Sequence, residues 1–200
     1  MALSTARKPI DAKRIKRKAG MKSNKYFVFD LDNTLVKTNR ANNQSYKDAI
    51  FAVTGKSIVI TKNRFTRDDL ASTFPDLSII QMEMVINAKE TCYPNHITET
   101  KLNRQLVKIL ELLYDEGCKP ILLTESRKTR TQQVCNYHKV THFFSSIYCK
   151  EDYPNLTKYE FLRSLGIQVG TVVLFENEQA EIRKAIQCGL NENQIIKVKF

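Results

Sequence analysis

The sequence predicts an α/β fold built on a parallel β-sheet. Short and almost continuous apolar runs, typical of strands buried on both faces, alternate along the chain with segments whose apolar residues recur at helical spacing. That alternation is typical of a parallel sheet covered by helices. One stretch between the first strand and the clearest helix is far longer than an ordinary βα loop, which indicates an inserted unit.

Three apolar runs give the clearest strands. They are residues 26–30, the run ILLT within KPILLTES that ends at Thr124, and residues 171–175. Residues 143–149 are a further candidate. The C-terminal IIKVKF is expected to add a strand at the edge of the sheet.

The helices follow the strands in turn. The clearest spans 98–116, where apolar residues fall at helical spacing, with Thr98 expected to cap its start and Gly117 to end it. The other core helices are expected at 128–138, 157–165 and 178–187.

The long stretch after the first strand is predicted to be a mainly helical insertion at 39–93. It holds an expected helix at 41–54 and two more around 66–73 and 77–89, with Pro75 between the last two. The predicted domain organisation is therefore a basic tail at 1–25, an α/β core made of 26–38 and 94–200, and the insertion between the two core segments.

Composition points to a soluble, cytoplasmic protein. Of the 200 residues, 42% are hydrophobic and 26% are charged, which is typical of a globular domain. No apolar run approaches the ~20 residues needed to span a bilayer, and no secretory signal is apparent. The five cysteines are scattered and lack CxxC spacing, so we expect free thiols rather than a zinc site or disulfides.

Positive charge is concentrated ahead of the first strand. Residues 1–25 carry nine basic side chains and one acid, a net charge of +8 that leaves only +3 of the total +11 for the rest of the chain. With few apolar residues, this tail is expected to be disordered. It could contact nucleic acid or another anionic surface, could be a targeting address, or could be a solvated extension without a partner.

Polar residues follow all three of the clearest strands. The first runs into Asp30, Asp32 and Thr34, the second ends at Thr124, and the third precedes the segment 176–178 (Glu-Asn-Glu). Ligands of open parallel sheets lie beyond the carboxyl ends of the strands. A short helix that begins near Lys158 adds a positive charge. Acids, a hydroxyl, a lysine and helix N-termini together favour a site for phosphate and Mg²⁺.

These motifs resemble those of the haloacid dehalogenase superfamily. The sequence FDLDNTL resembles motif I, an apolar strand followed by DxDx[TV], and ILLTES resembles motif II. Lys158 resembles the lysine of motif III, and VVLFENEQAEIRKAIQCGL resembles the motif IV segment. The resemblance covers residues 26–198 and implies a Rossmann-like parallel sheet, with the insertion at 39–93 in the place of a C1-type helical cap.

The resemblance also implies roles for individual residues. Asp30 would be the nucleophile that forms an aspartyl-phosphate, and Asp32 would act as the general acid and base. Thr124 and Lys158 would bind the phosphoryl group. Mg²⁺ would be held by Asp30, the backbone carbonyl of Asp32 and Asn177. The implied function is a Mg²⁺-dependent phosphatase of small phosphomonoesters.

Several alternatives stay open from the sequence. Asn177 stands where the family has an aspartate, so Glu176 or Glu178 could supply the metal ligand instead. Lys150 is a rival to Lys158. The tail could make the protein a phosphatase of nucleic-acid ends, and the altered fourth motif could make it a phosphate-binding module without turnover.

Overall fold

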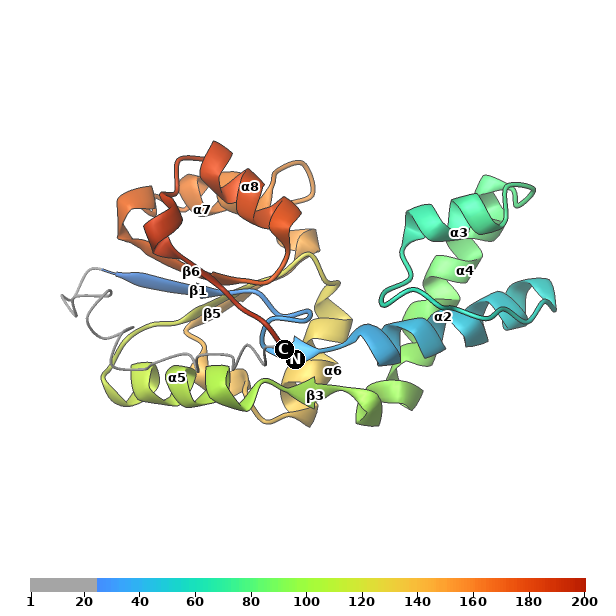
Figure 1. Cartoon of the computed structure of the whole chain (residues 1–200), viewed down its shortest axis with the longest axis horizontal. Helices are drawn as coiled ribbons and strands as arrows, with labels where there is room; N and C mark the ends of the chain where they lie inside the picture. The colour runs from blue at the N-terminus through green and yellow to red at the C-terminus, as the bar shows by residue number, and fades with distance from the viewer. Residues whose placement is uncertain (1–24) are drawn as a thin grey trace, which may run out of the picture.

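A computed structural model describes residues 25–200, so the prediction of a disordered tail at 1–25 lies almost wholly outside the described residues. Five parallel strands form the central sheet in the order β5-β4-β1-β6-β7 (Figure 1). Their bounds are β1 Tyr26–Phe29, β4 Ile121–Leu123, β5 Ser146–Tyr148, β6 Val172–Glu176 and β7 Ile195–Lys197. The predicted α/β class with a parallel sheet is confirmed.

Helices cover both faces of this sheet, as Figure 1 shows. Side chains of β1 alternate between two cores: Phe27 and Phe29 pack with α5 and α6, whereas Val28 packs with α7 and α8. The four helices are α5 Arg104–Asp115, α6 Lys128–Tyr137, α7 Lys158–Ser164 and α8 Gln179–Gln187. Burial on both faces explains why the strands read as unbroken apolar runs.

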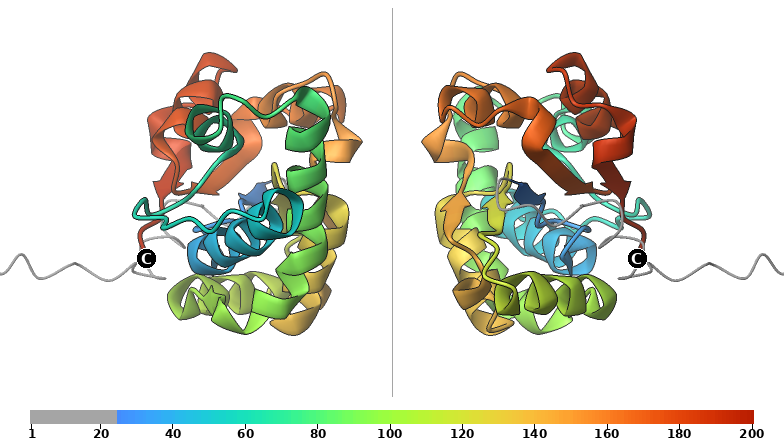
Figure 2. Two further views of the ribbon diagram at one scale, coloured as in Figure 1. Left: turned by 90° about the vertical axis from the view of Figure 1, so that its right-hand side faces the viewer. Right: turned by 90° about the vertical axis from the view of Figure 1, so that its left-hand side faces the viewer.

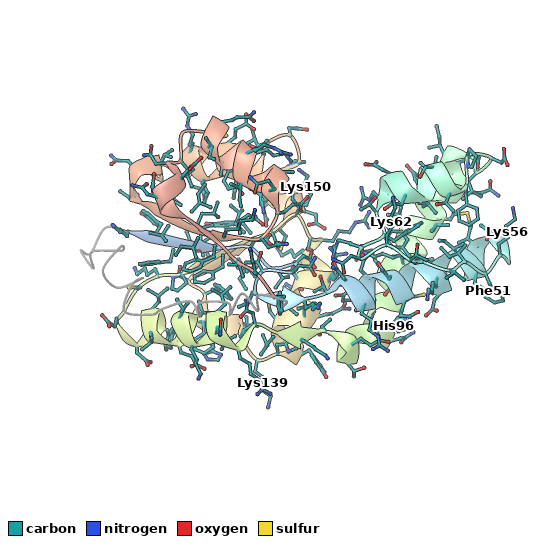
Figure 3. The ribbon with its side chains drawn as sticks, in the orientation of Figure 1. Phe51, Lys56, Lys62, His96, Lys139 and Lys150 are labelled. Carbon is teal, nitrogen blue, oxygen red and sulfur yellow. The ribbon has the colours of Figure 1, made fainter. Side chains whose placement is uncertain are left out.

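Three further helices project beyond one end of the sheet. They are α2 Asn39–Thr54, α3 Arg67–Thr73 and α4 Ile79–Cys92. They share a small core of their own that includes Tyr46, Ile50 and Val85. Figure 2 (left) shows α2 nearly end-on with α4 beside it, and Figure 3 labels Phe51 and Lys56 at the end of α2 far from the sheet. We call this three-helix unit, with the loops between its helices, the cap.

The return from the cap to the sheet differs from the prediction of one helix over 98–116. Residues Tyr93–Glu99 form the 3₁₀ helix η1, and β3 (Lys101–Leu102) pairs antiparallel with β2 (Val36–Lys37) before α5 begins. Asn103, not Thr98, caps α5, because its side chain accepts a hydrogen bond from the Leu106 amide. No helix within residues 25–200 is long and apolar enough to cross a membrane.

Candidate active site

The strand ends that carry the predicted site residues meet at one edge of the sheet. Phe29 lies level with Leu122 of β4 and with Phe175 of β6, and the Asp30 amide donates to the Phe175 carbonyl over 3.1 Å. Asp30 therefore follows the central strand at the point where Glu176 closes β6. The parallel register, set by buried apolar residues, brings together polar groups that are more than 140 positions apart in the sequence.

Asp30 and Lys158 form a buried ion pair. The Lys158 ammonium lies 3.1 Å from Asp30 Oδ1, 2.8 Å from Glu176 Oε2 and 3.7 Å from Glu181 Oε2. Burial lowers the pKa of Lys158, but the neighbouring carboxylates outweigh burial and hold it well above its ordinary value. Burial and the Glu176 charge raise the pKa of Asp30 to about 8, although Lys158 opposes this.

Glu176 is fully engaged within the protein. One carboxylate oxygen accepts from Lys158, and the other accepts from the backbone amides of Asn177 and Glu178 at 2.9 and 3.0 Å. Its residue exposure is 1%, whereas Glu178 is exposed. Glu176 thus orients Lys158 and shapes the turn after β6.

Asn177 lies against the loop that carries the two aspartates. Its side-chain oxygen accepts a 2.8 Å hydrogen bond from the Thr34 hydroxyl. The turn itself depends on Asn33, which adopts a left-handed φ of 59° that asparagine tolerates better than most residues. The Asn33 side chain donates to Asn39 Oδ1 at the start of the cap, so this turn also connects the site to α2.

Thr124 and Lys150 occupy different surroundings. Thr124 is buried at the end of β4, and its hydroxyl oxygen accepts from the Ser126 amide over 3.1 Å, which leaves the hydroxyl proton free to donate. Lys150, labelled in Figure 3, has a side chain that is 41% exposed and pairs with Glu125 at 3.3 Å. Of the two candidate lysines, only Lys158 contacts Asp30.

The Asp32 carboxylate is held by a different set of partners. It accepts short hydrogen bonds from the Thr38 and Ser126 hydroxyls, and its Oδ2 lies 3.4 Å from Arg130 Nη2 and 3.6 Å from Arg64 Nη2. Burial raises the pKa of Asp32, but the two guanidinium groups and the two hydroxyls outweigh burial and hold it below its ordinary value. Asp32 is therefore a fixed carboxylate that joins the cap to the core.

Sequence reasoning missed the arginines of this arrangement. Arg130 lies one helical turn after Ser126, and its guanidinium donates a 2.5 Å hydrogen bond to the Ser126 hydroxyl. The fully polar segment that directly follows the strand of motif II could have indicated that this arginine belongs to the site. Arg64 comes from the loop between α2 and α3, and its contacts with Thr38 and Asn39 join residues about 25 positions apart. Nothing in the local pattern around Arg64 marks it.

The surroundings of Asp30 suit a divalent cation. Three buried carboxylates (Asp30, Glu176 and Glu181) face the ammonium of Lys158 and that of Lys184, which pairs with Glu181 at 2.6 Å, so negative charge is in excess when all three are ionised. Within residues 25–200, no group of three or more His, Cys, Asp or Glu side chains is arranged as a metal site. The predicted ligand set does not require such a group, because it combines one carboxylate with a backbone carbonyl and an amide oxygen.

Comparison with known proteins identifies the family. The profile of the family described as haloacid dehalogenase-like hydrolase matches residues 27–193. The chain belongs to this family. No curated protein gives a significant match to the sequence.

Several solved structures share the fold. A predicted phosphoglycolate phosphatase from Haemophilus somnus has a TM-score of 0.72 and 17% identity, over 89% of this chain and 86% of that one. CbbY from Rhodobacter sphaeroides, in complex with xylulose-(1,5)-bisphosphate, has a TM-score of 0.72 and 16% identity, over 88% and 86%. A putative β-phosphoglucomutase from Thermotoga maritima has a TM-score of 0.64 and 16% identity, over 88% and 86%.

Proposed function

We propose that this haloacid dehalogenase-like hydrolase is a Mg²⁺-dependent phosphatase that acts on a small phosphomonoester through an aspartyl-phosphate. The observation that carries the proposal is the buried Asp30–Lys158 pair at the end of the central strand. Support also comes from the relatives named above, among which are proteins described as a phosphatase and as a protein bound to a sugar bisphosphate.

Asp30 would attack phosphorus with a carboxylate oxygen, so that a P–O bond to Asp30 forms as the bond to the leaving alcohol breaks. Lys158 contacts one oxygen of Asp30 and would balance the negative charge on the phosphoryl group. The Thr124 hydroxyl would donate a hydrogen bond to a phosphoryl oxygen. Once it carries a proton, Asp32 would give that proton to the leaving oxygen and later take one back from the attacking water.

The ligands that we propose for Mg²⁺ are a carboxylate oxygen of Asp30, the backbone carbonyl of Asp32 and Asn177. When bound, the ion would neutralise charge and polarise the phosphoryl group. Asn177 is the proposed third ligand because Glu176 is already saturated and Glu178 is exposed, whereas Asn177 contacts the loop of the aspartates. The cap would cover the substrate, and its boundaries at residues 39 and 93 remain a prediction.

Phosphate release from a generic aryl phosphate tests the proposal. We expect release that needs Mg²⁺, stops with EDTA and is lost in Asp30→Asn. Absence of release from aryl phosphates and from a panel of phosphorylated metabolites would favour a binding module instead. Activity that is much greater on DNA or RNA 3′-phosphates, falls steeply with salt and requires residues 1–22 would favour a nucleic-acid-end phosphatase.

A cytoplasmic location is part of the same proposal. All five cysteines are free thiols, and Cys135 and Cys149 are buried in the core. Free thiols of this kind are typical of proteins kept in a reducing compartment.

A further inference from the structure

Three cationic side chains gather where the cap meets the core. Arg64 lies between α2 and α3, Lys89 lies on α4 and Arg130 lies on α6; we call these three residues the cap-side cations. Among residues 25–200 they face only two carboxylates. Arg64 and Arg130 approach Asp32 at 3.6 and 3.4 Å, and Lys89 and Arg130 approach Glu90 at 3.0 and 3.5 Å. The cluster therefore carries one positive charge in excess.

This excess charge is largely removed from water. Lys89 is 4% exposed and Arg130 is 8% exposed. Aromatic rings line the cluster: the Lys89 ammonium lies 5.5 Å from the Tyr46 ring and 5.7 Å from the Tyr93 ring, and the Arg130 guanidinium lies 5.5 Å from Tyr93. Burial and the neighbouring Arg130 lower the pKa of Lys89 to about 8. A buried surplus of cations is costly unless an anion compensates it.

Two buried polar groups in the cluster also lack partners. The Tyr93 hydroxyl and Arg130 Nε make no hydrogen bond within residues 25–200. Tyr93 is completely buried, and its pKa is raised by burial and by the Asp32 charge. Both groups are hydrogen-bond donors, so an oxygen-rich anion would satisfy them together with the excess charge.

We infer that the cap-side cations bind a second anionic group of the substrate, a carboxylate or a second phosphate, apart from the phosphoryl group at Asp30. This inference rests on the proposed phosphatase function. The incoming group replaces Asp32 as the partner of Arg64 and Arg130. The Asp32 carboxylate then keeps only its hydrogen bonds from the Thr38 and Ser126 hydroxyls, which it exchanges as it turns towards the leaving oxygen. Binding of the second anionic group thus selects the substrate and at the same time releases Asp32, the proposed acid and base.

A simpler interpretation is that the arginines only fasten the cap to the core. On that interpretation, loss of Arg64 changes the stability of the protein but alters activity equally for every substrate. On ours, loss of Arg64 removes a preference between substrates. The two interpretations differ in the ratio of kcat/KM between a substrate with a second anionic group and one without it. A general loss of activity does not change this ratio.

The experiment uses pairs of phosphomonoesters in which only one member carries a second anionic group. The pairs are 2-phosphoglycolate with its neutral amide, and propane-1,3-diyl bisphosphate with 3-hydroxypropyl phosphate. We expect kcat/KM to be higher for the anionic member of at least one pair by about 10- to 100-fold, the range of one charged hydrogen-bond contact. Equal values within both pairs would overturn the inference and leave the phosphatase function standing.

Arg64 is the residue to vary, because its side chain is 29% exposed and it lies in a loop. Arg64→Ala should bring the kcat/KM ratio between the two members of a pair to within about twofold of one. Arg64→Lys should restore part of the preference for the anionic member. Arg40→Ala is the matched control, since Arg40 is a cap arginine that pairs with Glu99 outside the cluster, and it should keep the full ratio. A ratio that survives Arg64→Ala would overturn the inference.

Direct binding separates this inference from the proposed function. Calorimetry with the same four compounds on the wild-type chain and on Asp30→Asn needs no turnover. Tighter binding of an anionic member, lost in Arg64→Ala, would support the subsite even if no phosphate were ever released. Equal binding of all four compounds would overturn the subsite whatever the activity.

Discussion

Two carboxylates that are two residues apart lie in opposite electrostatic surroundings. Around Asp30, three carboxylates face the ammonium groups of Lys158 and Lys184, so negative charge is in excess when all three are ionised. Around Asp32, two guanidinium groups approach one carboxylate, and positive charge is in excess once Lys89 and Glu90 are included. The first pocket belongs to the core, and the second is completed by the cap.

The difference indicates what each pocket can bind. A surplus of carboxylates attracts a cation, and a surplus of cations attracts an anion. On the proposed function, the two pockets would therefore bind the two ends of a metal-bound phosphorylated molecule. The turn at Asn33 makes this possible, because it directs the chain from the end of β1 into the cap within a few residues.

The largest expected effect is on the Asp30 pocket. Asp30→Asn should lower turnover by at least ~10³-fold, a barrier increase of about 4 kcal/mol, because the amide is a poor nucleophile. Steady-state release of phosphate measures it. Asp76→Asn, at an exposed aspartate of the cap, should leave turnover unchanged. Near-normal activity in Asp30→Asn would rule out the covalent mechanism.

Removal of the Lys158 ammonium should lower the stability of the core. Lys158→Met leaves the buried carboxylates of Asp30 and Glu176 without a counter-charge, at a cost of about 3–5 kcal/mol in the free energy of unfolding. Lys150→Met removes a partly exposed lysine that pairs with a partly exposed glutamate, and it should change that free energy by less than ~1 kcal/mol. Urea titrations of both variants without metal give the comparison, and equal losses would show that the ammonium of Lys158 is not structurally required.

The surroundings of Asp30 were predictable from sequence, whereas the cations around Asp32 were not. The buried strand before Asp30 and the capped helix start at Thr157 are local patterns, and the register of parallel strands then brings Asp30 and Lys158 together. Arg64 reaches Asp32 through the tertiary arrangement of the cap, which leaves no local pattern. The start of α5 was wrong for a similar reason: pairing of β3 with β2 replaced the helical turn that the sequence favoured.

The two aspartates should give opposite pH signatures in the metal-free protein. The pKa of Asp30 is raised from 3.8 to about 8, so the native state keeps a proton that the unfolded chain has already released. Its contribution to stability therefore falls as pH rises from about 4 to 8. Asp30→Asn should become progressively more stable than wild type across that window. The difference at pH 8 should reach at least ~1.4 kcal/mol, the value of one pKa unit.

Asp32 provides the matched comparison. Its pKa is held below the ordinary value by Arg64 and Arg130, so its contribution is present above the unfolded pKa of 3.8 and is lost as pH falls below that value. Asp32→Asn should be less stable than wild type at pH 7, and the difference should shrink in acid. Thermal unfolding of Asp30→Asn, Asp32→Asn and wild type from pH 3 to 8 measures these differences in stability. If the stability difference from wild type changed with pH in the same direction for both variants, the contrast between the pockets would be contradicted.

The smallest expected effect concerns the metal ligands beside Asp30. Asn177 supplies a neutral amide oxygen next to the loop of the aspartates, so Mg²⁺ should bind loosely, with half-saturation on the order of millimolar. Asn177→Asp adds a charged oxygen, which Mg²⁺ prefers, and should lower the half-saturating concentration severalfold with equal or higher turnover. Asn177→Ala should raise the half-saturating Mg²⁺ concentration.

Glutamate variants provide the control for this last prediction. Glu178→Gln should match wild type in magnesium titrations, because Glu178 is exposed. Glu176→Gln should lower stability, since Glu176 shares the charge of Lys158, and any remaining activity should keep its dependence on Mg²⁺. If instead Glu176→Gln abolished that dependence while both Asn177 variants behaved like wild type, the ligand would be Glu176. The excess negative charge around Asp30 would then act directly on the metal rather than through Lys158.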